Sequence, residues 1–585
     1  MKNWDLTPLY SNFNSPKITK DFEQVTTLIH QVQDEVSTLD TQSPKLGQAL
    51  VSIQKKRDTL ENLLGRLHNF GHLAYATDTT NHPAATLIEK VEAILPNYTL
   101  LQVQLTMFLK KITDLDALIA STPELSEYAF VLNEAKKASN HLLSQDEELL
   151  LAQLTTTGSL AWGRLQDQIV SSLTGELDTT PVTLTTLRSK AYDNDASIRK
   201  SAYEAELAAY IKKERESAAA LNAIKGEVIT VANKRRYSCP LEMTLEASRM
   251  DRQTLDAMLS AIKEYLPYFR EYLLKKAEIL GHSNGLPFYD LFAPIGRVDM
   301  RYTYDEAKAY IIKHFTQFDS SLGQYAQKAF DQNWIDPFPK DNKVAGAFCS
   351  NIHAIGESRI LSNFSGSFSD MTTLAHELGH GYHGECLKDA RPLNADYPMP
   401  LAETASIFCE TIVFQAALEK ASLEEQKVIL ENDLMGSTQV IVDIYSRYLF
   451  ETALFEKRKN SSLSVDELKQ TMLDAQKEAY GEALDPNYLH PYMWMCKPHY
   501  YEASMNFYNF PYAFGLLFAK GLYHMYQKDP VAFVPKYKAL LEATGAHSIH
   551  DVLSIMGIDS HDPSFFKNSL ELVKKDIEKY LDINA

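Results

Sequence analysis

Apolar residues recur at every third or fourth position through much of the chain. The pattern is clearest at residues 19–39 and 46–76, continues at 147–173, and returns from 193 to 280. This spacing matches the 3.6-residue turn of an α-helix, so each stretch is predicted to be an amphipathic helix with one buried side. The chain is therefore expected to be mainly α-helical.

Two short segments break the helical pattern. Residues 175–187 and 343–367 are rich in Thr, Val, Gly and Ser, which predicts short strands joined by turns. Residues 281–296 contain clustered Gly, Pro and Asn and are predicted to be a loop. Because 585 residues exceed the size of one compact core, we expect two helical lobes, an N-terminal lobe at 1–200 and a second region at 201–585.

Composition and charge limit the classes of partner. Hydrophobic residues make up 45% of the chain and charged residues 23%, which is ordinary for a soluble globular protein. The 58 Lys and Arg stand against 76 Asp and Glu, and this net charge of −18 argues against nucleic acid or an anionic membrane as partner. The N-terminus has no apolar run typical of a signal sequence, and no stretch is expected to approach a membrane span. The five cysteines include no CxxC pair, so we expect a reduced, cytoplasmic protein without a disulfide framework.

The segment "MTTLAHELGHGYH" (371–383) carries the clearest chemical signal. His376 and His380 are four residues apart, so on a helix they project from the same side. Two neutral imidazoles placed in this way can bind one metal ion, and zinc is the commonest fit. Glu377 would lie beside that metal, where it could take a proton from a water molecule. This is the H-E-x-x-H pattern, which is typical of zinc hydrolases.

The surroundings of the motif favour a metal site over a structural helix. Asp370 is expected to cap a helix that begins at Met371. Glycine weakens a helix by about 1 kcal/mol relative to alanine, so three glycines in one helix indicate that another element packs closely there. These are Gly379, Gly381 and Gly384.

A third metal ligand is available downstream. A metzincin would need a histidine six residues after His380, and Cys386 occupies that position, so this class is excluded. Pro400 opens a run that is predicted to be helical, on which Glu403 and Glu410 are two turns apart and share a face. Two carboxylates on an otherwise apolar helix are unfavourable unless they are paired or bound to metal. Glu403 as a ligand and Glu410 as its supporting partner explain both residues, and the alternative is that both are ordinary exposed glutamates.

"TTLAHELGHGYH" followed by "PLAETASIFCE" resembles the thimet-oligopeptidase-like zinc peptidases, specifically the bacterial oligoendopeptidase F branch. The resemblance extends over most of the chain, through "WDLTPLY", "LPFYDLFAP", "GAFCSN", "RILSNFSGS" and "FYNFPYAFG". It implies that His376, His380 and Glu403 bind one Zn²⁺ and that Glu377 is the general base. It also implies an almost entirely helical fold with a deep substrate channel between two lobes and a small β-sheet next to the H-E-x-x-H helix, so that 201–585 is the zinc-peptidase catalytic region.

The same resemblance indicates catalytic residues near the C-terminus. Family members carry a His and one or two Tyr that face the zinc, and the matching positions are His499, Tyr508 and Tyr512. The two tyrosines are four apart and would share a helical face, although core packing is the alternative for each. They would donate hydrogen bonds to the oxygen on which charge develops. His383 is expected to be a packing or substrate-side residue rather than a metal ligand.

We therefore predict a cytoplasmic zinc endopeptidase that cleaves short, unfolded peptides. The strands of 343–367 could bind an extended substrate along an exposed edge, or could form only a structural hairpin. Two other functions stay open at this point: a zinc carboxypeptidase or dipeptidyl-carboxypeptidase on the same helical fold, and an inactive peptide-binding protein. Short peptides are the expected partners, with neither nucleic acid nor membrane, and the oligomeric state is left open.

Overall fold

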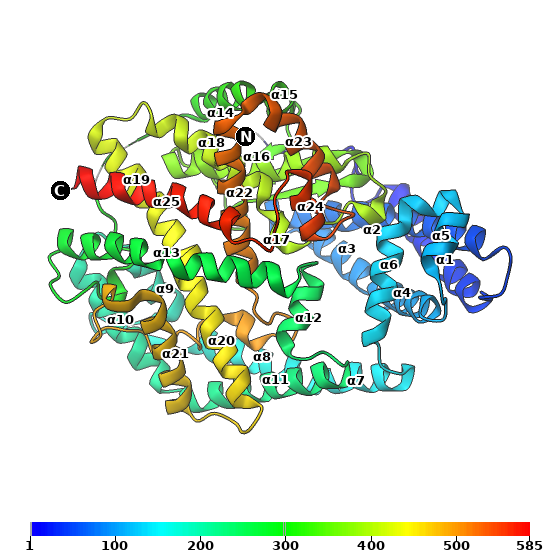
Figure 1. Cartoon of the computed structure of the whole chain (residues 1–585), viewed down its shortest axis with the longest axis horizontal. Helices are drawn as coiled ribbons and strands as arrows, with labels where there is room; N and C mark the ends of the chain where they lie inside the picture. The colour runs from blue at the N-terminus through cyan, green and yellow to red at the C-terminus, as the bar shows by residue number, and fades with distance from the viewer. Residues whose placement is uncertain (1–2, 297, 299, 585) are drawn as a thin grey trace. The chain divides into compact units, whose positions relative to one another are not determined.

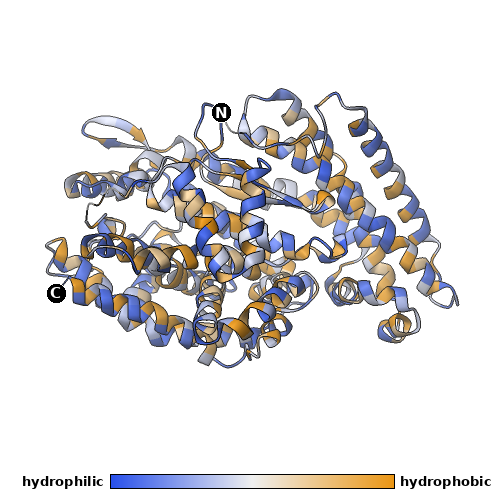
Figure 2. Ribbon diagram, turned by 90° about the horizontal axis from the view of Figure 1, so that it is seen from above, coloured by the Kyte–Doolittle hydropathy of each residue, from blue (hydrophilic) through white to orange (hydrophobic). Residues whose placement is uncertain are grey.

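The computed structural model describes residues 3–296, 298 and 300–584, and most of them are helical (Figure 1). The predicted mainly α fold is confirmed. In Figure 2 apolar and polar residues alternate around the helices, so that many helices present one side of each kind. This is the arrangement that the three- and four-residue spacing of apolar positions predicts, because an amphipathic helix is stabilised chiefly by burial of its apolar side.

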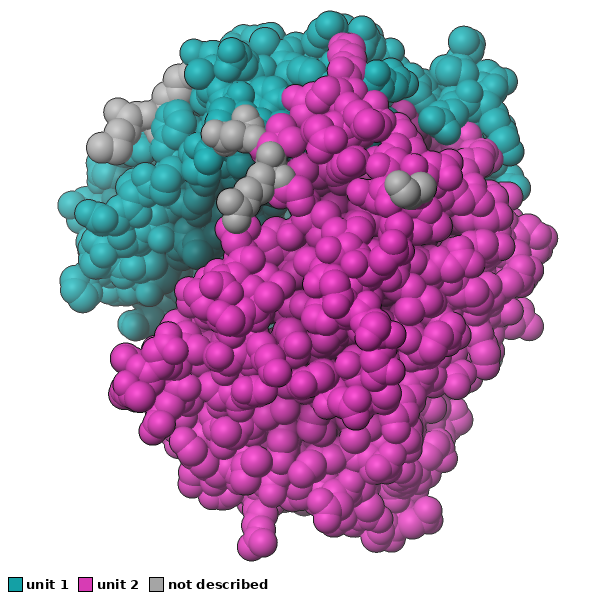
Figure 3. Space-filling view, turned by 90° about the vertical axis from the view of Figure 1, so that its left-hand side faces the viewer, with its two compact units in different colours: residues 1–142, 299–419, 525–558 teal, residues 143–298, 420–524, 559–585 magenta. Residues whose placement is uncertain are grey.

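The chain divides into two compact units, drawn in separate colours in Figure 3. The first unit comprises residues 1–142, 299–419 and 525–558. One hydrophobic core of this unit is built largely from α1 and α2 and the helices that follow them. Its helices are α1 (Pro16–Ser37), α2 (Leu46–Thr77), α3 (His82–Glu92), α4 (Leu95–Leu109), α5 (Leu115–Ser121), α6 (Ala129–Ala138), α14 (Tyr304–Phe318), α15 (Ser320–Asp331), α16 (Phe368–Leu387), α17 (Met399–Ala402), α18 (Thr404–Leu418), α23 (Pro530–Ala543) and α24 (Ile549–Ile555).

The second unit comprises residues 143–298, 420–524 and 559–585 and has a separate hydrophobic core. The boundary expected near residue 200 falls inside this unit rather than between the two. Its helices are α7 (Gln145–Thr157), α8 (Ser159–Ser172), α9 (Leu184–Ser189), α10 (Ala196–Ile211), α11 (Glu214–Lys234), α12 (Pro240–Ala247), α13 (Arg252–Ile279), α19 (Leu423–Thr438), α20 (Ile444–Arg458), α21 (Val465–Tyr480), most of α22 (Phe510–Lys528), and α25 (Ser564–Ile583).

Strands occur in or next to the two segments that were predicted to form them, and a further strand, at 335–336, lies before the second segment. In the second unit β1 (Thr174–Leu177) and β2 (Thr180–Thr183) form an antiparallel hairpin. In the first unit β3 (Ile335–Asp336), β5 (Glu357–Leu361) and β4 (Phe348–Ile352) form a three-stranded sheet in that order. The strand β4 is antiparallel to β5 and lies at the edge of the sheet. Both strands pack against α16, which confirms the small sheet next to the histidine helix.

One expectation about apolar stretches is wrong. Residues 399–418 are long and apolar enough to cross a membrane by length and composition, although no such stretch was expected. However, 67% of the apolar window is buried inside the fold. A helix that is apolar on all sides is also what a protein core requires, and α18 packs against both α14 and α16.

Candidate metal centre

The helix that carries the histidines begins three residues earlier than predicted. α16 starts at Phe368, and its N-terminal cap is Ser367 rather than Asp370. The Ser367 hydroxyl accepts a hydrogen bond from the Asp370 backbone N–H, and the Asp370 carboxylate accepts one from the Ser367 N–H, each at 3.0 Å. This reciprocal arrangement satisfies two backbone donors at once, which is why the serine rather than the aspartate becomes the cap.

The three glycines of α16 lie where other groups approach the helix, which confirms the predicted close packing. A Cβ atom on Gly379 would lie 2.5 Å from the carbonyl oxygen of Ala405 in α18. One on Gly381 would lie 1.8 Å from the Tyr325 hydroxyl. These distances are far below van der Waals contact, so any larger residue would push α16 away from its neighbours.

The structure brings together the three residues predicted as metal ligands. One nitrogen each of His376 and His380 and one oxygen of Glu403 all lie within 4.8 Å of one another. The Glu403 Oε2 is 3.2 Å from His376 Nε2 and 3.5 Å from His380 Nε2. Glu403 lies at the junction where α17 ends and α18 begins, and not within one continuous helix as predicted. The break turns its carboxylate toward both imidazoles.

Further contacts hold these three side chains in place. The Glu410 Oε2 lies 3.1 Å from His376 Nδ1, on the side of the ring opposite Glu403, as predicted for a supporting carboxylate. The Ser406 hydroxyl donates to Glu403 at 2.7 Å. The Asn351 amide of β4 donates to the backbone carbonyl of His380 at 3.0 Å. Ser406 and Asn351 were not identified from the sequence, because their roles depend on tertiary packing and not on a spacing motif.

The charges in the centre are unbalanced. Burial disfavours a positive charge on His376, but the carboxylates of Glu403 and Glu410 outweigh burial and raise its pKa to about 10. Burial lowers the pKa of His380 to about 4, and the neighbouring His376 contributes to the shift. Burial also opposes charge on Glu403, yet the two histidines lower its pKa to about 2. A single imidazolium therefore faces a pair of carboxylates, and this set of groups favours an added cation.

Glu377 lies in the same helix but in a different environment. Its side chain is buried, and burial raises its pKa to about 7. The positive charge of His376 lowers this pKa, whereas the carboxylates of Glu403 and Glu410 raise it. A carboxyl group whose pKa is close to neutral can both accept and release a proton at physiological pH. Glu377 thus has the proton affinity that a general base requires.

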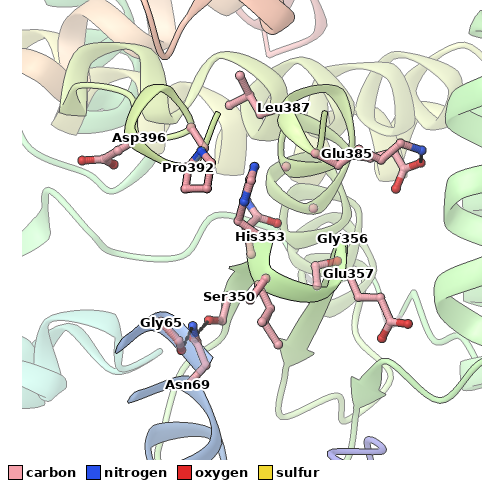
Figure 4. Close-up of a pocket in the computed structure, with 18 of the residues that line it drawn as sticks. Gly65, Asn69, Ser350, His353, Gly356, Glu357, Glu385, Leu387, Pro392 and Asp396 are labelled. Carbon is pink, nitrogen blue, oxygen red and sulfur yellow. Dashed lines mark hydrogen bonds and ion pairs between the residues drawn. The ribbon is translucent and has the colours of Figure 1, made fainter. Parts of the chain in front are cut away.

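A cavity of about 450 Å³ lies in the first unit beside the C-terminal part of the histidine helix. It is lined by β4 and the turn after it, by the C-terminal part of α16, and by α2 (Figure 4). In Figure 4 the Ser350 side chain of β4 is joined to Asn69 of α2, at 2.6 Å. Within the described residues β4 pairs with β5 on one side only, so its other edge has no strand beside it.

The residues predicted to stabilise developing charge lie in the second unit. Tyr508 precedes α22 instead of sharing its face with Tyr512, yet the two hydroxyls are hydrogen-bonded at 2.7 Å. The ring of His499 lies 5.5 Å from that of Tyr508. His499 is buried, and burial lowers its pKa to about 3, so the ring is neutral. Its Nε2 has no hydrogen-bond partner within the described residues.

His383 is a packing residue in this structure. It is fully buried, its Nε2 lies 2.8 Å from the Thr544 hydroxyl, and its ring stacks on Tyr397 at 4.0 Å. These contacts all lie within the first unit, and His383 does not belong to the group formed by the three predicted ligands.

Comparisons with known proteins agree with these features. The model of peptidase family M3 matches residues 189–572, and an oligopeptidase F model matches residues 112–174. Oligopeptidase PepF of Bacillus subtilis (strain 168) is 23% identical over 575 residues, which cover 96% of this chain and 84% of that protein. An oligoendopeptidase F homolog of Borreliella burgdorferi is 25% identical over 551 residues, 90% of each chain. The crystal structure of oligoendopeptidase-F from Enterococcus faecium has a TM-score of 0.68 and 17% identity, covering 97% of this chain and 98% of that chain.

Proposed function

Because the chain belongs to peptidase family M3 and is a metalloendopeptidase, we propose that it uses one Zn²⁺ to cleave internal bonds of short, unfolded peptides in the cytoplasm. The single observation that carries the proposal is the convergence of His376, His380 and Glu403 within 4.8 Å. The curated relatives named oligopeptidase and oligoendopeptidase support peptides as the substrate class.

The residues of the centre fit zinc in number and kind. Two imidazole nitrogens and one carboxylate oxygen form the three-ligand set that catalytic zinc sites use, with a further position open to water or substrate. The carboxylate of Glu410 on the far nitrogen of His376 supports the fit, because it fixes the tautomer that leaves Nε2 free to bind metal. A zinc ion held there supplies Lewis-acid chemistry by polarising the peptide carbonyl and lowering the pKa of water.

Glu377 supplies the proton transfer in this proposal. Its carboxylate takes a proton from the attacking water and passes it to the amine that leaves when the peptide bond breaks. Its raised pKa favours both steps near neutral pH. We assign hydrogen-bond donation to the developing oxyanion to His499, Tyr508 and Tyr512, as the resemblance implies. We assign binding of the extended substrate backbone to the edge of β4, which gives register with little choice of side chain.

The test uses a fluorogenic peptide of about ten residues, which spans roughly 33 Å when extended. It is blocked by acetylation at its N-terminus and amidation at its C-terminus. An endopeptidase cuts this peptide at internal bonds, and a chelator abolishes cleavage. A second peptide of the same sequence has a free C-terminus. A carboxypeptidase or dipeptidyl-carboxypeptidase would cut only this second peptide, and an inactive binding protein would cut neither. The protein is also incubated with a native globular protein and, separately, with the tryptic peptides of that protein. Efficient digestion of the folded protein would contradict the proposed preference for short, unfolded peptides.

A further inference from the structure

The second unit contains a cavity that the proposed peptidase chemistry does not use. Its volume is about 120 Å³, which is room for several water molecules or one small anion. The mouth includes Tyr192, whose side chain is 55% exposed and whose ring lies 5.2 Å from that of Phe292. Four cationic side chains line the cavity, against two carboxylates: Arg188, Arg199, Arg447 and Lys497 against Glu206 and Asp443.

Two of the arginines are paired at the wall of this cavity. The Arg199 Nε lies 2.6 Å from Asp290, and both side chains are almost fully buried. Arg188 lies 2.7 Å from Glu206. Each of these guanidinium groups therefore has an opposite charge beside it, and neither requires a ligand for charge balance.

Lys497 and Arg447 are less well matched. Lys497 has no hydrogen-bond or ion-pair partner among the residues that the structure describes. Arg447 is bonded to Asp443 by one terminal nitrogen, and its buried Nε has no partner in the described part of the chain. Burial lowers the pKa of Lys497. The charges of Arg447 and Arg188 lower it further, whereas Cys496 and Asp443 raise it. Lys497 and Arg447 thus line the same cavity, and the carboxylate of Asp443, which also lines it, is bonded to Arg447.

A third polar group points to a ligand as well. His490 lines the cavity and is only 1% exposed. Neither ring nitrogen has a hydrogen-bond partner in the residues described, although Nε2 lies 3.4 Å from a carboxylate oxygen of Glu206. Buried polar atoms in proteins are nearly always hydrogen-bonded, to protein, water or ligand. A buried imidazole without a hydrogen-bond partner and the ammonium of Lys497 line one cavity, which indicates that the cavity holds a ligand that they bind.

We propose that this cavity is a binding site for a small oxyanion, a carboxylate or a phosphate group, held by Lys497 and Arg447. Charged oxygen acceptors form the strongest hydrogen bonds with ammonium and guanidinium groups. The anion supplies hydrogen bonds that these partly buried cations lose with their hydration, and its negative charge offsets the repulsion between the two cations. The site lies entirely within the second unit and does not require the proposed zinc chemistry.

Binding is measured on the whole protein with sodium phosphate, sodium acetate and neutral acetamide, at constant ionic strength, by calorimetric titration and by melting temperature. Phosphate or acetate is expected to bind saturably and raise the melting temperature, and acetamide is not. Lys497→Met is expected to weaken anion binding by about tenfold or more, because it removes one charge-assisted hydrogen bond. Lys459→Met is the matched control: it removes an exposed lysine of the same unit that pairs with the exposed Glu456.

Binding of phosphate alone identifies a free phosphate or phosphorylated ligand, binding of acetate alone identifies a carboxylate, and binding of both identifies a general oxyanion site. Binding that is unchanged by Lys497→Met overturns the proposal, since it then takes place elsewhere, for example at the metal centre. If neither anion binds, the proposal is also overturned. Without anion, Lys497→Met should be at least as stable as the parent protein, because it removes an unpaired cation; a variant that fails to fold would show that Lys497 has a structural partner and would also overturn the site.

Discussion

The metal centre of the first unit and the buried ion pairs of the second unit handle charge in opposite ways. In the second unit Lys225 lies 3.0 Å from Glu451 and 2.9 Å from Asn506, and Lys276 lies 2.6 Å from Glu431. Both lysines and both glutamates are at most 2% exposed. Each cation already has its carboxylate, so these pairs are complete without any ligand.

In the metal centre positive and negative groups also lie close together, but the carboxylates outnumber the cations. One nitrogen each of His376 and His380 and one oxygen of Glu403 lie within 4.8 Å of one another, and Glu410 adds a second carboxylate beside His376. Since buried charge is unfavourable unless it is paired, the difference separates structural from functional charge. Loss of one partner of a matched buried pair destabilises the fold, whereas unmatched ligand atoms gathered at one place indicate a bound ion.

The largest effect is expected from Glu377→Gln. The amide cannot accept a proton, so kcat should fall by about 10²- to 10⁴-fold, the usual contribution of a general base. Zinc content should stay at one ion per chain, because the three ligands are intact. Steady-state kinetics and metal analysis of the same preparation measure both quantities. Glu424→Gln, at an exposed position, is the control, and near-parental turnover in Glu377→Gln would remove the general-base assignment.

Lys225→Met should lower stability by about 3–5 kcal/mol, because it leaves Glu451 buried without its partner. Chemical denaturation followed by circular dichroism measures the shift in midpoint. The surface variant Lys459→Met should change stability by about 1 kcal/mol or less. If the two variants behaved alike, the distinction between complete buried pairs and solvated surface pairs would not hold in this unit.

Substitution of the two tyrosines is expected to have a smaller effect on kcat. Tyr508→Phe and Tyr512→Phe each remove one hydroxyl and break the 2.7 Å bond between them. A donor to the developing oxyanion should lower kcat by about 10²-fold with little change in KM. The tyrosine that only supports the donor should have a smaller effect, so the pair of variants identifies which hydroxyl acts. Unchanged kcat in both variants and in His499→Ala would contradict the assignment of this group.

How far the sequence predicted the fold can be judged from particular elements. The helices over 16–37 and 46–77 and the strands β4 and β5 lie where apolar spacing and β-branched residues predicted them. The start of α16 was misplaced, because Ser367 and Asp370 are both good caps and only the capping box decides between them. The division of the chain into units made of separated segments leaves no mark in local composition, because it depends on contacts between residues far apart in sequence.

The candidate site follows the same rule. His376 and His380 were predictable because a four-residue spacing is a property of one helix. Glu403 was predicted as a ligand both from its spacing to Glu410 on an otherwise apolar run and from the resemblance, but the helix break beside it was not predicted. Asn351 and Lys497 belong to no motif: Asn351 comes from the neighbouring strand, and Lys497 acquires its significance only from the arginines that folding places around it.

The smallest effect is expected from Glu410→Ala. This variant tests whether a carboxylate that supports a ligand, without binding the metal itself, contributes to metal affinity. Glu410 contacts His376 through Nδ1 and no other member of the centre. Loss of such a supporting carboxylate typically weakens metal affinity by about 10- to 100-fold, because the ring loses its fixed tautomer and orientation. Glu403→Ala removes a ligand outright and should weaken binding much more. Competition with a fluorescent zinc chelator measures both dissociation constants. Equal losses in the two variants would mean that Glu410 itself binds the metal, and no loss in Glu410→Ala would mean that its 3.1 Å contact with His376 does not orient the ring.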